Sequence, residues 1–244
     1  NDRLENGFSY WVKGVLSDYQ ATITKYAGND AGFYSQSDGD GKYYVGQKIG
    51  EIWGYHSNGL FQSDDEAATI DQSELYAGKW GAGDVKYEDL GNDGKITKGE
   101  ETIYNPGDKS IIGNKTPRYQ FGITVGFDYK NFDFEMFWQG TGKRDYMLSG
   151  AQFWGFPSQW DVPYTPALDY WTETNTDAYF PRPGWQNGGN RVTSDRYLQS
   201  AAYGRLKNLT VGYTIPKNLT TKWGISRLRL YVTGENLLTI TPLN

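Results

Sequence analysis

The sequence predicts an all-β chain of antiparallel strands, and three observations support this. Apolar and polar residues alternate with a period of two in several segments, which is the pattern of strands with one apolar face. Aromatic residues make up 16 % of the 244 residues, although the mean hydropathy is −0.70. The chain also contains 31 glycines, and helical periodicity is scarce. Together these features indicate aromatic-rich strands joined by polar loops.

The clearest strands are expected at residues 118–129 and 132–140. In the first, the odd positions from Tyr119 to Tyr129 are aromatic or aliphatic, and the positions between them are polar or glycine. Lys130 and Asn131 are expected to form a tight turn before the second. Four further strands are expected at residues 7–16, 20–27, 203–215 and 227–240.

Three local features qualify this strand pattern. Trp11 and Val15 break the alternation of the first strand. Residues 20–27 form the weakest expected strand. A short helix is expected from Asp64 to Tyr76, with Ser63 as its N-cap.

The connections between the expected strands alternate in length. Residues 28–117 and 141–201 form long loops, whereas the links at 17–19, 130–131 and 216–226 are short. Successive links of antiparallel strands lie at opposite ends of a sheet, so the long loops are expected on one side. This is typical of a bacterial transmembrane β-barrel, with long extracellular loops and strands of about 9–11 residues. A soluble β-sandwich, in which two apolar faces pack together, would show the same alternation.

Composition excludes several other classes. The net charge is −5 and no basic block is present, so nucleic acid is not an expected partner. Cysteine is absent, which excludes a disulfide framework and thiolate chemistry. No segment approaches the roughly 20 apolar residues of a membrane-spanning helix. No signal peptide opens the sequence, and its start and end look like the interior of a strand and the exit from one, so we expect a fragment of a longer chain.

A calcium loop is expected between residues 89 and 100. In loops of the EF-hand type, side-chain oxygens alternate with a glycine at the sixth position, which Gly94 would occupy here. The alternative is a solvated Asn-Asp-Gly turn. The expected ligands are Asp89, Asn92, Asp93, the Lys95 carbonyl and Glu100, with Asp108 as a rival for the last position.

Aromatic residues in the loop at 141–201 suggest a substrate platform, because aromatic faces stack on the C–H faces of sugars. The alternative is that these rings pack the core of the loop or contact a lid protein. The residues concerned are Trp154, Phe156, Trp160, Trp171 and Trp185.

Three charged or titratable residues could have a role in catalysis or in contact with lipid. His56 is the only histidine, so a Ser-His-Asp site would depend on it, and a structural role is expected instead. Arg205 and Lys207 share the parity of Leu209, which places them on the apolar face at the outer end of a strand. There they could meet lipopolysaccharide phosphates, unless a bulge turns them into solvent.

Five segments carry motifs that together resemble one family. Lys48 stands where that family's pattern has proline. The segments are VGQKIGEIWGYHSNGLFQSDDEA (45–67), GDVKYEDLGNDGKIT (83–97), PGDKSIIGNKTPRYQFGI (106–123), FWQGTGKRD (137–145) and YGRLKNLTVGYTIPKNLTTKWGISRLRLYVTGENLLT (203–239). In this order they resemble the SusC/RagA family of TonB-dependent outer-membrane transporters.

The resemblance implies a barrel of about 22 strands, plugged by an N-terminal domain, of which this chain supplies about six strands near the C-terminal end. The plug, the TonB-contacting segment and the last strand would lie outside the chain. A SusD-like surface lipoprotein would cover the barrel, and the TonB-ExbB-ExbD complex would drive import of an oligosaccharide through the outer membrane. The resemblance implies no catalytic residues and no required cofactor, and it places outer-membrane lipid against the apolar face.

Three alternatives to oligosaccharide import remain at this point. A peptide importer of the same family would share the fold. A soluble secreted glycan-binding protein, similar to a lectin, would bury the apolar face in its own core. A glycosidase would need a pair of carboxylates, which spacing in the sequence does not reveal.

Overall fold

The structure is a computed structural model that describes residues 2–4, 7–34, 43–155, 158, 160–184 and 186–243. It separates into two compact units. The first, here called the sheet unit, contains residues 1–20, 117–144 and 200–244. The second, here called the loop unit, contains residues 21–116 and 145–199. No helix in the described part of the chain has the length and apolar character needed to span a membrane.

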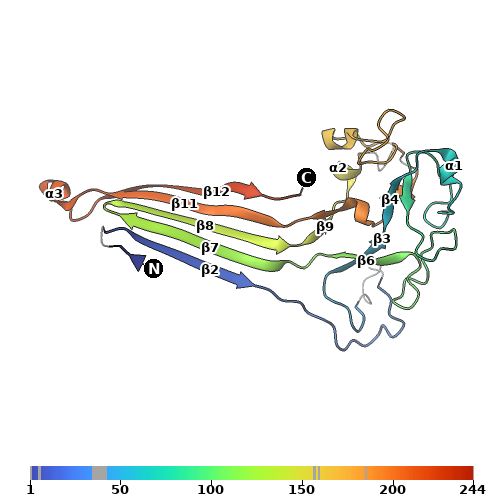
Figure 1. Cartoon of the computed structure of the whole chain (residues 1–244), viewed down its shortest axis with the longest axis horizontal. Coiled ribbons are helices and arrows are strands. Elements are labelled where there is room, and N and C mark those ends of the chain that lie inside the picture. Colours follow the sequence, from blue (N-terminus) through green and yellow to red (C-terminus); the bar gives the residue numbers. More distant parts are fainter. Residues whose placement is uncertain are drawn as a thin grey trace. The chain divides into compact units, whose positions relative to one another are not determined.

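The sheet unit is built on one six-stranded antiparallel sheet with the order β1-β2-β7-β8-β11-β12. Figure 1 shows its five long strands side by side. The strands are β1 (Asp2–Arg3), β2 (Ser9–Ser17), β7 (Arg118–Tyr129), β8 (Phe132–Lys143), β11 (Tyr203–Thr214) and β12 (Arg229–Ile240).

Long and short connections leave opposite ends of this sheet. The links from β2 to β7 and from β8 to β11 are long and leave the same end, because each strand is antiparallel to its neighbour. Lys130 and Asn131 join β7 to β8 at the other end. The link from β11 to β12, which contains α3 (Lys217–Thr220) and η4 (Thr221–Trp223), lies at that end too. The sheet therefore has the separation of links that the sequence predicts.

The expected strand at residues 20–27 is wrong. Thr22 forms only an isolated bridge with Lys48, and the Ile23 amide donates to the Gln47 carbonyl at 2.9 Å. Most side chains here are exposed, so the segment has no apolar face that a sheet could bury. The sixth strand of the sheet is β1 instead, and the expected short link at 17–19 is part of the long connection from β2 to β7.

The apolar residues of neighbouring strands share one face of the sheet. Val12 on β2 pairs with Val125 on β7, which pairs with Met136 on β8. Phe127 and Phe134 stack with their ring centroids 5.1 Å apart. This face has no cover within the described residues: Leu16 is 72 % exposed, and the β12 residues on it are similarly open.

Trp11 and Val15, which break the alternation, lie on the opposite face of the sheet. Each stands opposite a glycine of β7, Trp11 against Gly126 and Val15 against Gly122. A Cβ added at Gly126 would lie 2.2 Å from Trp11 Cζ2. The missing side chains of β7 therefore provide the space that these large residues of β2 occupy.

A bulge changes the predicted position of Arg205. The register shifts between Leu206 and Asn208, so that Arg205 pairs with Gln139 on the polar face. One inserted residue reverses the parity of every residue beyond it. Arg205 Nε donates to Thr239 Oγ1 at 2.9 Å, and the prediction that Arg205 shares a face with Leu209 is wrong.

An ion pair crosses the polar face between two strands that are not neighbours. Arg229 on β12 donates Nε and Nη2 to the Asp133 carboxylate on β8, at 3.0 and 2.5 Å. The pair passes over Gly212 on β11, where a Cβ would lie 2.4 Å from Asp133 Oδ2. Glycine at this position therefore allows the ion pair to form.

The described residues of the loop unit form three two-stranded sheets, of which β3–β6 and β4–β5 are antiparallel. Its one helix predicted from sequence begins as expected, because the Ser63 side chain accepts from the Glu66 amide, but ends at Ala67 rather than Tyr76. The sheets pair β3 (Glu51–Tyr55) with β6 (Lys109–Asn114), β4 (Ser57–Leu60) with β5 (Val85–Tyr87), and β9 (Asp145–Met147) with β10 (Leu198–Ser200). The helices are α1 (Asp64–Ala67), α2 (Ala151–Trp154), η1 (Thr165–Leu168), η2 (Gly188–Arg191) and η3 (Asp195–Tyr197).

The loop unit has a core rich in buried tyrosine. Tyr87 and Tyr197 are fully buried, and their hydroxyls donate to the carbonyls of Gly189 and Asn190 at 2.7 and 2.9 Å. Each ring therefore contributes apolar area while its hydroxyl satisfies a loop carbonyl. This explains how a unit with short strands and long loops can be well packed.

A buried carboxylate fixes the loops around this core. Asp84 has no exposed surface, and Arg182 donates Nε and Nη2 to its two oxygens at 2.9 and 2.6 Å. Asn190 Nδ2 and the Gly81 amide also donate to it, at 2.8 and 2.9 Å. A buried charge is tolerated only when it is paired and hydrogen-bonded, as this one is.

Candidate ligand-binding site

A cavity of about 620 Å³ lies within the loop unit. Strands β3 and β6 supply one part of its wall, through Trp53, Tyr55 and Lys109. Tyr146 of β9 and Arg191 of η2 supply another part. The volume is within the range of pockets that hold small molecules or a few residues of an oligomer.

The cavity is cationic, although the whole chain carries a net charge of −5. Its lining contains four basic side chains and one carboxylate, that of Glu51. This carboxylate is already engaged, because the Tyr44 hydroxyl and the Lys48 amide donate to it at 2.5 and 3.1 Å. The basic residues are Lys98, Lys109, Lys115 and Arg191.

Lys109 is held in place at the cavity wall. Its Nζ lies 2.5 Å from Glu101 Oε1, and 5.8 and 5.6 Å from the ring centres of Tyr34 and Tyr55. The side chain is 15 % exposed. The ion pair and the two ring faces orient the ammonium group.

Arg191 is also partly desolvated. Burial lowers the pKa of the Arg191 guanidinium, since the charged form loses hydration. Arginine starts from so high a value that this group stays charged at neutral pH.

Aromatic rings form a second part of the lining. Tyr34 and Trp53 are stacked, with centroids 4.2 Å apart and planes 11° apart. Burial, and then the negative charge of Glu101, raise the pKa of Tyr34 to about 12. Tyr34 is therefore neutral at physiological pH, and its hydroxyl donates to the Pro106 carbonyl at 3.2 Å. Tyr146 is 46 % exposed.

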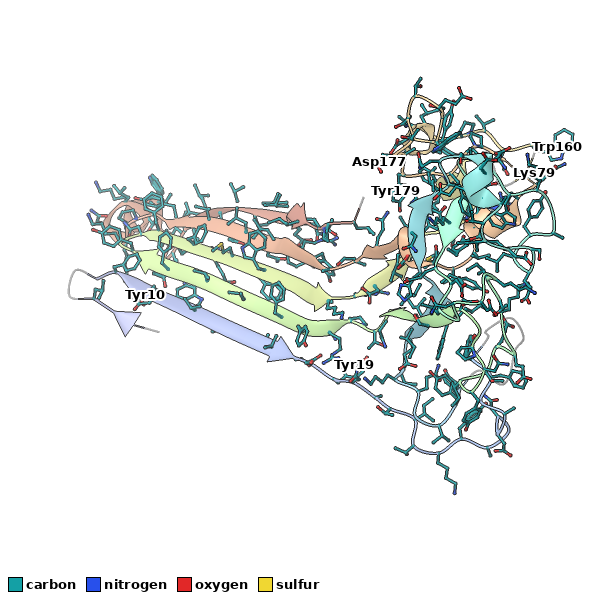
Figure 2. The ribbon with its side chains drawn as sticks, turned by 45° about the vertical axis from the view of Figure 1, so that its right-hand side comes forward. Tyr10, Tyr19, Lys79, Trp160, Asp177 and Tyr179 are labelled. Atoms are coloured by element: carbon teal, nitrogen blue, oxygen red, sulfur yellow. The ribbon has the colours of Figure 1, made fainter. Side chains whose placement is uncertain are left out.

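A second hollow in the loop unit has the opposite charge character. It has a volume of about 360 Å³ and contains the carboxylates of Asp169, Asp177 and Asp195. Figure 2 shows Asp177 next to Tyr179 there. Arg196 also lines it, but its guanidinium donates to the carbonyl of Tyr179. The two hollows would therefore favour ligands of opposite charge.

His56 joins three segments of the loop unit. Its Nδ1 lies 2.7 Å from Asp195 Oδ2, and its Nε2 lies 2.8 Å from Ser110 Oγ. The Ser57 amide also donates to Asp195 Oδ1 at 2.9 Å. The three side chains have the order of a catalytic triad, but Ser110 lies within β6, paired with Gly54. The contacts fit the structural role expected of His56, and its partners were not foreseen because they are 54 and 139 residues away.

None of the described residues of the predicted aromatic platform lines the cavity. Trp154 packs against Phe153 and Tyr197, at centroid distances of 4.8 and 4.6 Å. Trp160 is 84 % exposed and projects outward from its loop (Figure 2). Phe156 and Trp185 lie outside the described residues. Contact of these residues with substrate stays a prediction, for which Trp160 has the accessible ring.

Trp171, also considered for the platform, is half-buried. It packs against the partly buried edge of the aromatic core, and its Nε1 is buried without a hydrogen-bond partner in the described part of the chain. Its position resembles that of a core residue more than that of an open platform.

The residues of the predicted calcium loop do approach one another. A Cβ at Gly91 would lie 3.6 Å from Asp89 Oδ1, 3.8 Å from Asp108 Oδ1 and 3.9 Å from Asp93 Cγ. The Gly91 and Leu90 amides donate to Asp108 Oδ1 at 3.1 and 2.8 Å. The carboxylates of the loop therefore stabilise the turn itself.

The remaining oxygens of this loop do not complete a metal site. Asp89 Oδ2 and Asp93 Oδ1 accept from the amides of Gly94 and Lys95, while Asp89 Oδ1 is buried without a partner among the described residues. Asn92 adopts a φ of 55°, and Glu100 is exposed. Within the described ranges, no group of three or more His, Cys, Asp or Glu residues is placed to hold a metal ion. Calcium binding stays a prediction.

The basic cavity was not foreseen from the sequence. Lys98, Lys109 and Lys115 are separated by 11 and 6 residues, and Arg191 follows much later in the chain. Lys109 begins β6 and Lys115 directly follows it, but Lys98 and Arg191 belong to other segments of the chain. Their convergence depends on β3 and β6 pairing and on η2 folding against them.

Comparison with known proteins identifies the family. No family model matches the chain. TonB-dependent receptor P3 of Formosa agariphila is 33 % identical over 202 residues, which are 80 % of this chain and 18 % of that protein. TonB-dependent receptor P26 of the same organism is 27 % identical over 82 % of this chain and 19 % of its own length. The chain thus spans about a fifth of these relatives.

Solved structures agree with this assignment at the level of the fold. The RagAB peptide transporter matches with a TM-score of 0.68 and 16 % identity, over 99 % of this chain and 24 % of that chain. The RagAB peptide importer in its open-open state matches with a TM-score of 0.66 and 16 % identity, over 98 % of this chain and 24 % of that chain. The sequence similarity over four fifths of the chain shows that the chain belongs to the TonB-dependent receptors, and the solved structures show that it shares the fold of RagAB.

Proposed function

We propose that this chain is part of an importer that carries an oligosaccharide across the bacterial outer membrane, driven by TonB. The observation that carries the proposal is the uncovered apolar face of a sheet whose long connections leave one end. Because the chain belongs to the TonB-dependent receptors, we expect the transport to depend on TonB.

In this proposal the sheet unit lies in the membrane. Its apolar face contacts the lipid chains, and its polar face, which bears Asp133 and Arg229, lines the lumen. Figure 2 shows Tyr10 near one end of β2 and Tyr19 beyond the other end, and aromatic residues favour the two membrane interfaces.

The loop unit, with its long connections, then lies outside the cell and meets the substrate first. A SusD-like lipoprotein would cover the loops, and the TonB-ExbB-ExbD complex would act through parts of the protein beyond this chain. The transport step is non-covalent: binding, closure and release need no catalytic residue. Trp160 is the proposed aromatic contact for an incoming sugar, and the loop at residues 89–100 is the proposed calcium position.

Peptide import is the second candidate. It is favoured by the structural neighbours, which are a peptide transporter and a peptide importer. An oligosaccharide is preferred here because aromatic rings line the cavity of the loop unit, and such rings stack on sugars.

The test is deletion of the full-length gene in its own host, followed by uptake of labelled oligosaccharides and labelled peptides. We expect the protein in the outer-membrane fraction, slower migration of boiled than of unboiled samples on gels, and loss of oligosaccharide uptake on deletion. Loss of peptide uptake alone would favour the second candidate. A protein that is monodisperse in buffer without detergent would contradict the membrane proposal.

A further inference from the structure

We propose that the substrate is an acidic oligosaccharide, carrying carboxylate or sulfate groups, and that the cationic cavity of the loop unit binds it. This inference rests on the proposed importer function and narrows its substrate class. The proposed binding site is the cavity lined by Lys98, Lys109, Lys115 and Arg191.

The charge of the cavity is the first argument. Four cations line it, and its one carboxylate, Glu51, is 8 % exposed and already accepts two hydrogen bonds. The Glu101 carboxylate, 2.5 Å from Lys109 Nζ, offsets one of these four charges, which leaves an excess of positive charge around the cavity. A cation-rich cavity in a chain with a net negative charge concentrates positive potential at one place.

The four basic side chains of the cavity differ in their exposure and in the contacts that hold them. Lys98 and Lys115 are exposed, so their ammonium groups can reach a ligand without rearrangement of the core. Lys109 and Arg191 are more deeply placed and are held by Glu101, by ring faces and by the Gly184 carbonyl. The cavity thus combines two charges that are held by contacts with two charges on exposed side chains.

The aromatic lining favours a sugar over an acidic peptide. Trp53, backed by Tyr34, and the half-exposed Tyr146 provide flat apolar surface beside the charges. A sugar ring with an acidic substituent presents an apolar C–H face and a negative charge within one residue. An acidic peptide presents its charge on a flexible stem and has no comparable flat face.

The experiment compares charged oligosaccharides with neutral ones of the same length on the full-length transporter in detergent. The probes are tetragalacturonate with its methyl ester, and a sulfated galactan tetrasaccharide with its desulfated form. We expect at least one acidic probe to bind about tenfold more tightly than its neutral counterpart, a ratio typical of charge-assisted contacts. Raising the salt concentration should reduce this preference, because exposed charges are screened.

The variant Lys98→Gln/Lys115→Gln tests whether the cavity causes the preference for acidic probes over neutral ones. Both lysines are exposed, so folding should be retained, and we expect the acidic probe to bind about tenfold less tightly while the neutral probe is unaffected. The control Lys25→Gln/Lys79→Gln removes the same charge from exposed positions of the loop unit that do not line the cavity. Arg191→Lys is a second variant, which keeps the charge but changes the hydrogen-bonding geometry.

Several outcomes overturn the inference. Equal binding of acidic and neutral probes, no binding of any probe, or equal losses in the cavity variant and its control would each do so. Preferential binding of tetraglutamate, included as a fifth probe, would replace the sugar by an acidic peptide. Uptake distinguishes these failures from failure of the proposed function: if the deletion strain still loses oligosaccharide uptake, import stands while the acidic substrate falls.

Discussion

The sheet unit and the loop unit use apolar side chains in opposite ways. In the loop unit, Phe61, Val85 and Tyr197 have no exposed surface. In the sheet unit, none of the described hydrophobic residues is buried to this extent, and Val232 is 77 % exposed. A unit that buries its apolar residues is stabilised by its own core, whereas the sheet depends on what covers it. The loop unit therefore has a core of its own, whereas the apolar face of the sheet is exposed within the described residues.

The largest expected effect is in the core of the loop unit. Phe61→Ala should lower the free energy of unfolding of that unit by about 3–5 kcal/mol, because it leaves a cavity in a packed core. Phe132→Ala in the sheet unit is the matched control, because Phe132 is 54 % exposed. Limited proteolysis and thermal melting of the full-length protein in detergent would measure both. Similar losses for the two variants would break the comparison between the units.

The next effect tests what covers the sheet. Val232 and Thr233 are adjacent on β12 and point to opposite faces. We expect Val232→Lys to destabilise the membrane-inserted protein by about 2–4 kcal/mol if the residue lies near the bilayer midplane, and Thr233→Lys to have little effect. Folding into lipid vesicles under denaturant titration would measure the difference. Equal tolerance of both lysines would argue against lipid on the apolar face.

A smaller effect is expected where a large side chain uses the space above a glycine. In Gly126→Val, the new side chain would collide with Trp11, and overpacking of this kind costs about 1–3 kcal/mol. Gly14→Val is the control, because a Cβ at Gly14 has no neighbour within 4 Å. Thermal melting in detergent should separate the two variants. A milder effect at Gly126 than at Gly14 would show that Trp11 is free to move.

The smallest effect is spectroscopic and concerns the loop unit alone. Burial raises the pKa values of Tyr55, Tyr87 and Tyr197, and that of Tyr34 reaches about 12. A raised folded-state pKa contributes stability that is fully present below about pH 10, the ordinary tyrosine value, and is lost as pH rises through the folded-state value. An alkaline titration at 295 nm should show exposed tyrosines ionising first and a late group ionising only with unfolding. A single transition near pH 10 for all tyrosines would contradict the buried core.

The sequence was most informative where the pattern was local. The strands β7 and β8 and the tight turn at Lys130-Asn131 were predicted from the alternation of apolar and polar residues. The pattern failed at residues 20–27, where too few apolar residues alternate, and at Arg205, where a bulge of one residue reversed the parity. At Arg205 the sequence left a regular strand and a bulge as alternatives, and only the register of the strands decided between them.

The candidate site could not be foreseen in the same way. Trp154 was expected on a platform but packs beside Tyr197, because an aromatic residue in a loop can equally form that loop's core. Ser110 and Asp195 meet at His56 although they lie in distant segments. Residues that pack in the core of a loop and residues that bind a ligand are of the same types, so composition does not distinguish the two roles.

By itself the sequence determined the class of fold, the two faces of β7 and β8 and the family resemblance, because all three depend on spacing between near neighbours. Only the tertiary structure decided which residues meet across the loops: the lysines and Arg191 around one cavity, the carboxylates around Gly91, and Arg182 beside Asp84. The physical reason is that a strand's alternation is fixed by backbone geometry, whereas a loop's contacts are fixed by the packing of segments far apart in the chain.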